Sequence, residues 1–333
     1  MAALSNLVPN LVDAAKLVDS TGKAVPLAEI LMQDCGLLED MGWMQGSDSD
    51  GMDFLIRTGL PTPTWRKLNT GVQPSKGSTA RVKFTCGYLE AVSNVDILLA
   101  QKYPDNLIRR IEDEGEIQGM QHEAQRALLY EKESTNPERI TGLASYYESL
   151  STSVESSKNI VDAGGTGSDN TSIFIVTQGI NGFFGCYPKG SAAGLQVSAK
   201  NEPMIIADAT GIGGASYEGY QSRFKWALGC GLADWRNCAR ICNIDYSALM
   251  TDSSAADLVK LLTRATLMIK KPSNTKIYMR REVLSALDEQ ARASVSTGGG
   301  INYAVVDGKP VMSWRGFPIK VVDAIKIDEA RIT

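Results

Sequence analysis

The longest pattern of apolar and polar positions in this chain is helical and covers residues 104–132. Apolar residues recur there every three or four positions, and acidic residues favour its N-terminal half. Pro104 stands where a first-turn proline is tolerated. At 1.5 Å per residue the helix would be roughly 40 Å long, so we expect it to span the molecule. Its apolar positions are Leu107, Ile108, Ile111, Met120, Ala124, Ala127 and Leu128.

Shorter helical patterns and several strand patterns complete the chain. Helices are predicted at 27–41, from a cap at Asp252 or Ser253 to Lys270, and at 281–293. Residues 224–245 are interpreted as strand material that leads into a helical end. The remaining strand patterns are 53–57, 80–86, 172–178, 183–187, 203–207, 275–279 and 317–323, with a hairpin through Asp307-Gly308. Because both periods occur, we predict an α+β fold.

Gly115 and Gly119 interrupt the long helical pattern at an i, i+4 spacing. Glycine weakens a helix but lets another backbone approach closely. We interpret the pair as a place of close packing within the molecule, with a bend as the alternative.

The composition indicates a large protein outside the membrane. The chain has 333 residues, 43% of them hydrophobic, and a net charge of -4. This length favours two domains with extensions. No stretch approaches the roughly 20 apolar residues of a membrane span, and no secretion signal is recognisable. The six scattered cysteines fit reduced thiols in a cytosolic setting, and the acidic balance argues against a general nucleic-acid binder.

Residues 57–84 depart from this composition, because they hold six Lys or Arg and no Asp or Glu. Prolines and glycines break the segment, and its large apolar residues are too sparse for a core face. Residues 1–53, by contrast, hold nine acidic residues against Lys16 and Lys23. We predict a two-stranded arm with a basic tip that must find its contacts on another surface.

The sequence offers no convincing active site. Its single histidine, His122, lies within the long helix, and neither 164–167 (GGTG) nor 211–214 (GIGG) completes a phosphate-binding or dinucleotide-binding motif. Three cysteines lack the spacing of metal ligands and are interpreted as buried small hydrophobes, the last two on one helical face: Cys230, Cys238 and Cys242. We predict no catalytic residues, no cofactor and no metal.

Six segments spread over almost the whole chain carry a resemblance to a known family. They are GLPTPTWRKLNTGVQPSKG (59–77), ALLYEKESTNPERITGLASYY (127–147), GGTGSDNTSIFIV (164–176), YPKGSAAGLQ (187–196), FKWALGCGLADWRNCARICNID (224–245) and IYMRREVLSALDEQA (277–291). In this order they resemble major capsid proteins of tailed phages with the Hong Kong 97-like fold. Within that family they are most similar to those of short-tailed phages of the epsilon-fifteen and Bordetella phage type.

The resemblance implies a division of the chain. Residues 1–53 correspond to the N-arm, 54–86 to the extended loop (E-loop), 87–250 to the peripheral domain with the spine helix 104–132, and 251–333 to the axial domain. In the commoner chain order the axial domain follows the spine helix directly. Here strand-rich residues intervene, which implies a permuted connection with the peripheral sheet completed before the axial domain begins.

The resemblance also implies a function and partners. The chain would assemble as hexamers and pentamers into the virion capsid, in the host bacterial cytoplasm. It would meet a cementing or decoration protein, a portal and, without sequence specificity, the packaged double-stranded DNA on its inner face, but no membrane. Some relatives join subunits through a Lys–Asn bond, and since no matching partner motif is present we expect non-covalent assembly. The candidate intersubunit contacts in the loop are Trp65, Arg66, Lys67, Lys76 and Arg81.

Two alternatives remain open from the sequence. One is an encapsulin-like compartment shell, which shares the fold but encloses protein cargo. The other is a single-strand nucleic-acid-binding protein that uses residues 57–84 as a basic arm with Trp65 for stacking.

Overall fold

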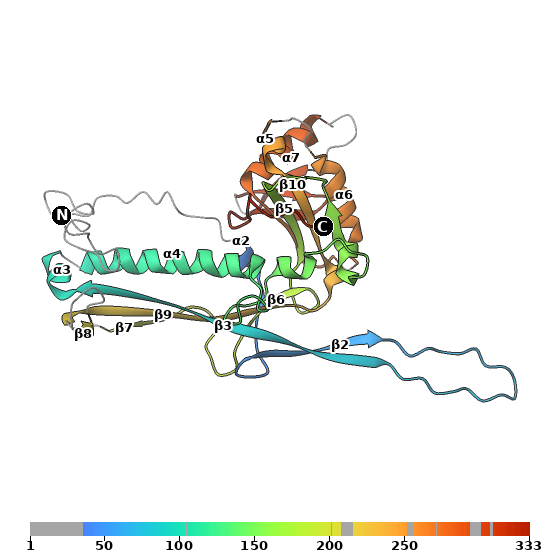
Figure 1. Ribbon diagram of the computed structural model, residues 1–333, viewed down its shortest axis with the longest axis horizontal. Helices are drawn as coiled ribbons and strands as arrows, with labels where there is room; N and C mark the ends of the chain where they lie inside the picture. Colours follow the sequence, from blue (N-terminus) through green and yellow to red (C-terminus); the bar gives the residue numbers. More distant parts are fainter. Residues whose placement is uncertain are drawn as a thin grey trace.

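The computed structural model describes residues 36–103, 106–200, 202–207, 216–251, 256–270, 272–293, 301–306 and 309–333. Two seven-stranded sheets meet at one end of a long helix, and a two-stranded ribbon projects from this junction (Figure 1). Most of the acidic N-arm, with the helix expected at 27–35, lies outside the described residues.

The first sheet is long and narrow, because two strands make up most of its length. β3 (Ser78–Asp96) and β9 (Ser216–Leu232) pair antiparallel from Cys86↔Gly229 to Asp96↔Gly219. β2 (Gly51–Gly59) extends the edge beside β3, and the order is β1-β6-β9-β3-β2. The remaining strands are β1 (Trp43–Gln45), β6 (Phe183–Tyr187), and β7 (Gln196–Ala199) and β8 (Met204–Ala207), both paired with β9.

The predicted long helix is confirmed as α4 (Leu107–Tyr130), which lies along β3 and β9 (Figure 1). Its 24 residues make it about 36 Å long. The chain turns into α4 through α3 (Ile97–Lys102), which Asp96 caps by accepting a hydrogen bond from the Leu98 backbone N–H. A small apolar cluster closes this end of the molecule: Val95, Leu99, Ala100 and Ile108.

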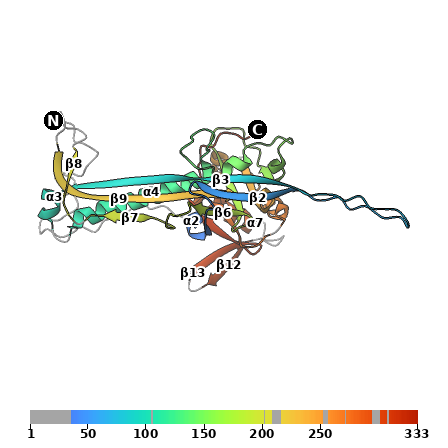
Figure 2. The same ribbon diagram turned by 90° about the horizontal axis from the view of Figure 1, so that it is seen from below.

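The second sheet has the order β12-β13-β14-β11-β5-β10-β4. Its inner strand β5 (Asn170–Thr177) is buried at all eight positions. The other strands are β4 (Ile160–Asp162), β10 (Cys238–Asp245), β11 (Thr275–Met279), β12 (Ile301–Val306), β13 (Lys309–Trp314) and β14 (Phe317–Val321). The β12–β13 pair extends from the body (Figure 2).

The middle of β5, Ile173 to Val176, is apolar because it faces two cores. Ile173 and Ile175 pack against the helices that cover one face of the sheet, while Phe174 and Val176 point to the other face. This alternation follows from the two-residue period of a strand. The covering helices are α5 (Tyr246–Thr251), α6 (Leu258–Met268) and α7 (Arg281–Ala293).

The opposite face of the second sheet shares its core with the first sheet. Leu128 and Leu129 of α4 lie in one apolar cluster with Phe174 of the second sheet and with Leu228 and Phe183 of the first. The short elements α2 (Gly36–Asp40), η2 (Leu143–Tyr147), η3 (Glu155–Asn159) and η4 (Trp235–Asn237) border the same junction. A single continuous core therefore joins the two sheets.

Every strand of the first sheet lies before residue 251, but the stretch 87–250 also supplies strands to the second sheet. The chain enters the second sheet at β4 and β5, returns to the first sheet for β6 to β9, and enters the second sheet again at β10. A boundary at residue 250 therefore does not separate the two sheets. Strand pairing between residues far apart in the chain decides sheet membership, and local periodicity does not reveal it.

Three local expectations also change. Residues 224–245 contain no α-helix, since β9 and β10 are linked by the 3₁₀ turn η4, so Cys238 and Cys242 share the face of a strand. Helix α6 begins at Leu258 and is capped by Asp257, whose side chain accepts from the Lys260 backbone N–H. Asp252 and Ser253 lie outside the described residues.

α4 runs unbroken through Gly115 and Gly119. A Cβ added at either glycine would meet no described atom within 4 Å. The prediction that another backbone packs closely against these glycines is therefore wrong for the part of the molecule that the structure describes.

A buried ion pair ties the C-terminal segment to this junction. Arg240 of β10 binds Glu329 at 2.8 Å, and both side chains are almost fully buried. Arg240 also donates to Ser172 Oγ and to the carbonyl oxygen of Tyr147, while Glu329 accepts from the hydroxyl of Tyr130. Burial, together with Glu329, raises the pKa of Tyr130 well above its ordinary value, which keeps this hydroxyl a donor. Two charges that are buried but fully hydrogen-bonded are costly to separate.

We predict that Glu329→Ala destabilises the unassembled protein by about 3–5 kcal/mol, because it leaves Arg240 buried without a counter-charge. Urea unfolding, followed by circular dichroism, measures the change. The matched control is Asp328→Ala, which removes an exposed carboxylate one residue away and should leave the free energy of unfolding nearly unchanged. Equal effects of the two variants would contradict the prediction.

Candidate functional site: an exposed basic loop and an apolar groove

The basic segment forms the tip of a ribbon that projects from the molecule. β2 and β3 pair from Gly51↔Thr85 to Gly59↔Ser78, and beyond this pair residues 60–77 form no strand. The ribbon leaves the junction in the direction away from α4 in both views (Figures 1 and 2). The predicted two-stranded arm with its basic tip is therefore confirmed.

The base of the ribbon is held by ion pairs within the chain. Arg81 binds Asp53, and Lys83 Nζ lies 2.8 Å from Asp50 Oδ2. The hydrogen bond from Arg81 lowers the pKa of Asp53, and the hydrogen bond to Asp50 raises the pKa of Lys83. Arg81 thus has a carboxylate partner in its own chain. The other three cations for which we expected intersubunit contacts, Arg66, Lys67 and Lys76, have no such carboxylate partner among the described residues.

At the tip, large side chains and cations face outward. Trp65 is 102% exposed and Leu68 94% exposed. Arg66 Nε donates to the Thr70 carbonyl oxygen at 3.0 Å, and Asn69 adopts a left-handed conformation (φ 63°) that closes the turn. Within the described part of the chain, Lys67 and Lys76 form no ion pair.

This arrangement cannot stabilise itself. An isolated two-stranded ribbon is marginal in water, and the tip buries neither its tryptophan nor its leucines. An exposed aromatic side chain flanked by cations suits contact with an apolar surface that is rimmed by carboxylates. The exposed tip is therefore a candidate binding element.

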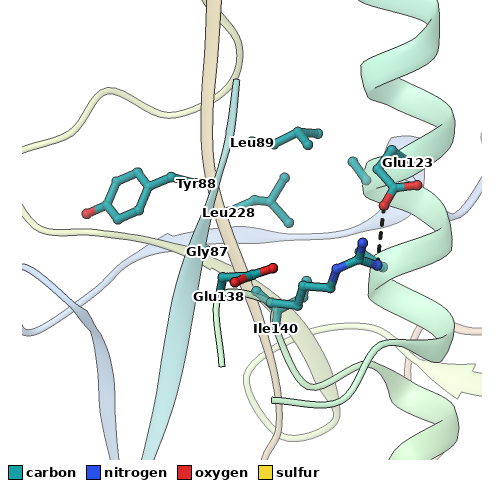
Figure 3. A pocket seen from close by; sticks show the side chains of 10 residues that line it. Gly87, Tyr88, Leu89, Glu123, Glu138, Ile140 and Leu228 are labelled. Carbon is teal, nitrogen blue, oxygen red and sulfur yellow. Dashed lines mark ion pairs between the residues drawn. The ribbon is translucent and has the colours of Figure 1, made fainter. Parts of the chain in front are cut away.

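A groove with these properties lies between α4 and the first sheet (Figure 3). Its volume is about 190 Å³. Leu89 and Leu228 point from β3 and β9 toward the helix, while Tyr88 points away to the other face of the sheet (Figure 3). The apolar lining is completed by Ala124, Ala127 and Ile140.

Three charged residues, Glu123, Glu138 and Arg139, line this groove. Arg126 lies 2.8 Å from Glu123 and 2.9 Å from Glu131, and Arg139 lies between the same two carboxylates. The hydrogen bond from Arg126 lowers the pKa of Glu123. Glu138 is exposed and has no ion pair with a described residue. Of the charged residues that line the groove, Arg139 and Glu123 are therefore already paired, while Glu138 is left to meet a cation.

The other candidate residues are not brought together as an active site. His122 lies on α4 beside Glu123 and Arg126, at a separate cavity of about 320 Å³. Burial raises the pKa of Cys238 and of Cys242 to about 12, so both stay protonated thiols at neutral pH. Among the described residues, no group of His, Cys, Asp or Glu has the arrangement of a metal site, and no helix is long and apolar enough to cross a membrane.

Sequence reasoning found the loop but missed the groove. The groove draws its lining from β3, α4, the segment 138–140 and β9, which are far apart in the chain. Each lining residue is an ordinary core or surface type for its element. The one local signal is Gly87, where an added Cβ would come within 3.3 Å of Ile140 Cγ2 and 3.2 Å of the Glu138 carbonyl oxygen.

Comparisons with known proteins give a family match and structural matches. A family model described as major capsid protein GP7 matches residues 19–333. The near-atomic cryo-EM structure of bacteriophage Epsilon15 is similar over 100% of both chains, with 27% identity and a TM-score of 0.74. No curated protein matches the chain.

Two further solved structures are similar at lower scores. The holo-SrpI encapsulin complex of Synechococcus elongatus PCC 7942 matches 71% of this chain and 96% of its own, with 11% identity and a TM-score of 0.44. The capsid of the native GTA particle matches 68% of this chain and 96% of its own, with 9% identity and a TM-score of 0.45. Both TM-scores are below 0.5.

We predict that Asp53→Asn loosens the base of the ribbon, because Arg81 loses its counter-charge. At pH 7, amide hydrogen exchange of Ser78–Val82 should become about two- to fivefold faster. The Asp53 pKa is lower in the folded chain. The stabilisation of the ribbon base by the Asp53 carboxylate is therefore complete above about pH 3.9, the ordinary pKa of an aspartate. It is lost as the pH falls through the lower pKa of the folded chain.

Asp48→Asn is the control for this experiment. The Asp48 carboxylate accepts from the adjacent Ser49 backbone N–H and forms no ion pair with Arg81. Unchanged exchange in the Asp53 variant, or an equal change in the control, would contradict the assignment of the Asp53–Arg81 pair to the ribbon base.

Proposed function

The chain belongs to the major capsid protein GP7 family, and from this premise we propose how it joins its neighbours in the shell. It is a structural protein of the virion capsid of a tailed phage and assembles with copies of itself. Family membership decides for this function over the encapsulin-like and nucleic-acid-binding alternatives. The proposal concerns the basic loop, which we infer to be the strap between one subunit and the next.

The observation that carries this proposal is the exposure of the loop tip. Trp65 is fully exposed at the end of a ribbon that projects beyond the body of its own subunit (Figure 1). Trp65, Arg66, Lys67 and Lys76 are the residues we propose to lie on a neighbouring copy. Arg81 supports them by pairing with Asp53 at the ribbon base.

We assign the parts of the subunit as follows. The ribbon and its tip, residues 54–86, form the E-loop, and residues 1–53 form the N-arm. The first sheet with α4 as spine helix forms the peripheral domain, and the second sheet with α5, α6 and α7 forms the axial domain. In this assignment the axial domain takes β4, β5 and β10 from the stretch before residue 251. The axial strands β4 and β5 are then the first strands after the spine helix, as in the commoner chain order, so the assignment does not need the permuted connection that the resemblance implied.

Weak contacts suffice for such a strap. An exposed ion pair contributes only about 0.2–1 kcal/mol, but a subunit in a closed shell makes many contacts at once, so their effects combine. Individually weak contacts also let misplaced subunits dissociate during assembly. We propose hexamers and pentamers as the building units and non-covalent joining of subunits.

The remaining partners are proposals that follow from the family. They are a portal, a cementing or decoration protein, and packaged double-stranded DNA held without sequence specificity on the inner face. Assembly in the cytoplasm of the host bacterium is proposed on the same ground.

We predict that Arg66→Glu combined with Lys67→Glu prevents particle formation, because reversed charges repel the acidic surface that the loop meets. The subunit should remain folded, since neither side chain contributes to a core. Negative-stain electron microscopy of the expressed variant should show a loss of at least tenfold in particle number, with circular dichroism unchanged.

The charge-preserving variant Arg66→Lys with Lys67→Arg is the matched control and should still form particles. Normal particles from the charge-reversed variant would refute the placement of the strap.

A further inference from the structure

We propose that the groove between α4 and β3 is the seat for the loop tip of a second copy of this chain. Trp65 of that copy enters the groove, and its Arg66 meets the acidic rim at Glu138. This inference rests on the proposed strap function and names the surface that receives the strap.

The tip of the same subunit cannot reach this groove. Trp65 lies six residues after Gly59, so it extends at most about 21 Å from the end of the paired ribbon. Gly87 at the groove lies nine residues behind Ser78 on β3, which is about 30 Å along an extended strand. Because the paired ribbon also points away from α4 (Figure 1), the occupant must come from another molecule.

The groove has the size and chemistry for an indole ring. Its volume is about 190 Å³, and an apolar cavity of roughly 150 Å³ accepts benzene. The floor consists of Ala124, Ile140 and Leu228, all of which are buried. Gly87 keeps this floor open, because a side chain there would come within 3.3 Å of Ile140. Tryptophan gains the most from such a site, because its large apolar surface is otherwise exposed.

The charges are complementary as well. Arg139, the arginine that lines the groove, is engaged with Glu123 and Glu131, so it does not oppose an incoming cation fully. Glu138 is exposed at the same mouth and has no ion pair in the described chain. Arg66 is adjacent to Trp65, and its one hydrogen-bond partner among the residues that the structure describes is a backbone carbonyl. A tip that inserts Trp65 therefore brings Arg66 to the rim that holds Glu138.

Cysteine cross-linking of assembled particles tests this placement. In Arg66→Cys with Glu138→Cys, diamide oxidation should join neighbouring subunits, and non-reducing electrophoresis should show a ladder of covalent multimers. Arg66→Cys with Glu114→Cys is the control, since Glu114 is exposed on α4 far from the groove. The five described native cysteines are buried. Equal ladders in both variants, or none with Glu138→Cys, would overturn the inference.

The single variant Glu138→Cys identifies a different occupant. Residues 1–35 include Cys35, so a ladder that forms without Arg66→Cys, and whose cross-linked peptide contains Cys35, would give the groove to the N-arm and refute our proposal. We expect no ladder from this variant. Adding Trp65→Ala to the Arg66→Cys and Glu138→Cys pair should reduce the ladder at least fivefold.

A charge exchange gives a second test with exposed residues, so that folding is not at risk. Arg66→Glu and Glu138→Arg should each lower particle yield several-fold, and the combined variant should restore most of the yield. A combined variant that is no better than the worse single variant would contradict the contact. If the wild-type chain itself forms no shells, the strap function fails. If wild-type shells form but cross-linking and rescue are both absent, only the groove assignment fails.

Discussion

The structure depends on one apolar core at the C-terminal end of α4, where both sheets meet. β5 places Phe174 and Val176 in this core, while its alternate residues Ile173 and Ile175 pack under the helices on the far face. α4 adds Leu128 and Leu129, and β9 adds Leu228 from the first sheet. The buried Arg240–Glu329 pair closes the same region against the C-terminal segment. Because all these elements share one core, the direction of the ribbon is fixed relative to the second sheet.

This rigid junction explains how a marginal ribbon can serve as a strap. β3 continues from the ribbon into the paired β3–β9 centre of the first sheet, so the ribbon base inherits the stability of the sheet. The Asp53–Arg81 and Asp50–Lys83 pairs add local support. Only residues 60–77 remain without strand pairing, and this short tip is the part that must adapt to a neighbour. In the proposed strap the cost of ordering the tip is met on assembly, which would couple folding of the tip to shell formation.

The sequence revealed features that depend on local periodicity and charge. The apolar repeat of α4, the cations of residues 57–84 and the apolar run of β5 each predicted the observed element. Features that depend on pairing at long range were missed. β5 and β10 joined the second sheet against expectation, and Cys238 and Cys242, four residues apart, fit the period of either a helix or a strand. The groove escaped detection because four separate segments line it.

The central claim is that the exposed tip is buried on a neighbouring copy in the shell. A cryo-EM map of particles assembled from the wild-type chain tests it most directly. Our account predicts continuous density for residues 60–77, with the Trp65 indole in the groove lined by Ala127 and Leu228 of the adjacent subunit. A tip that projects into solvent, or that rests on another surface while the groove stays empty, would contradict it.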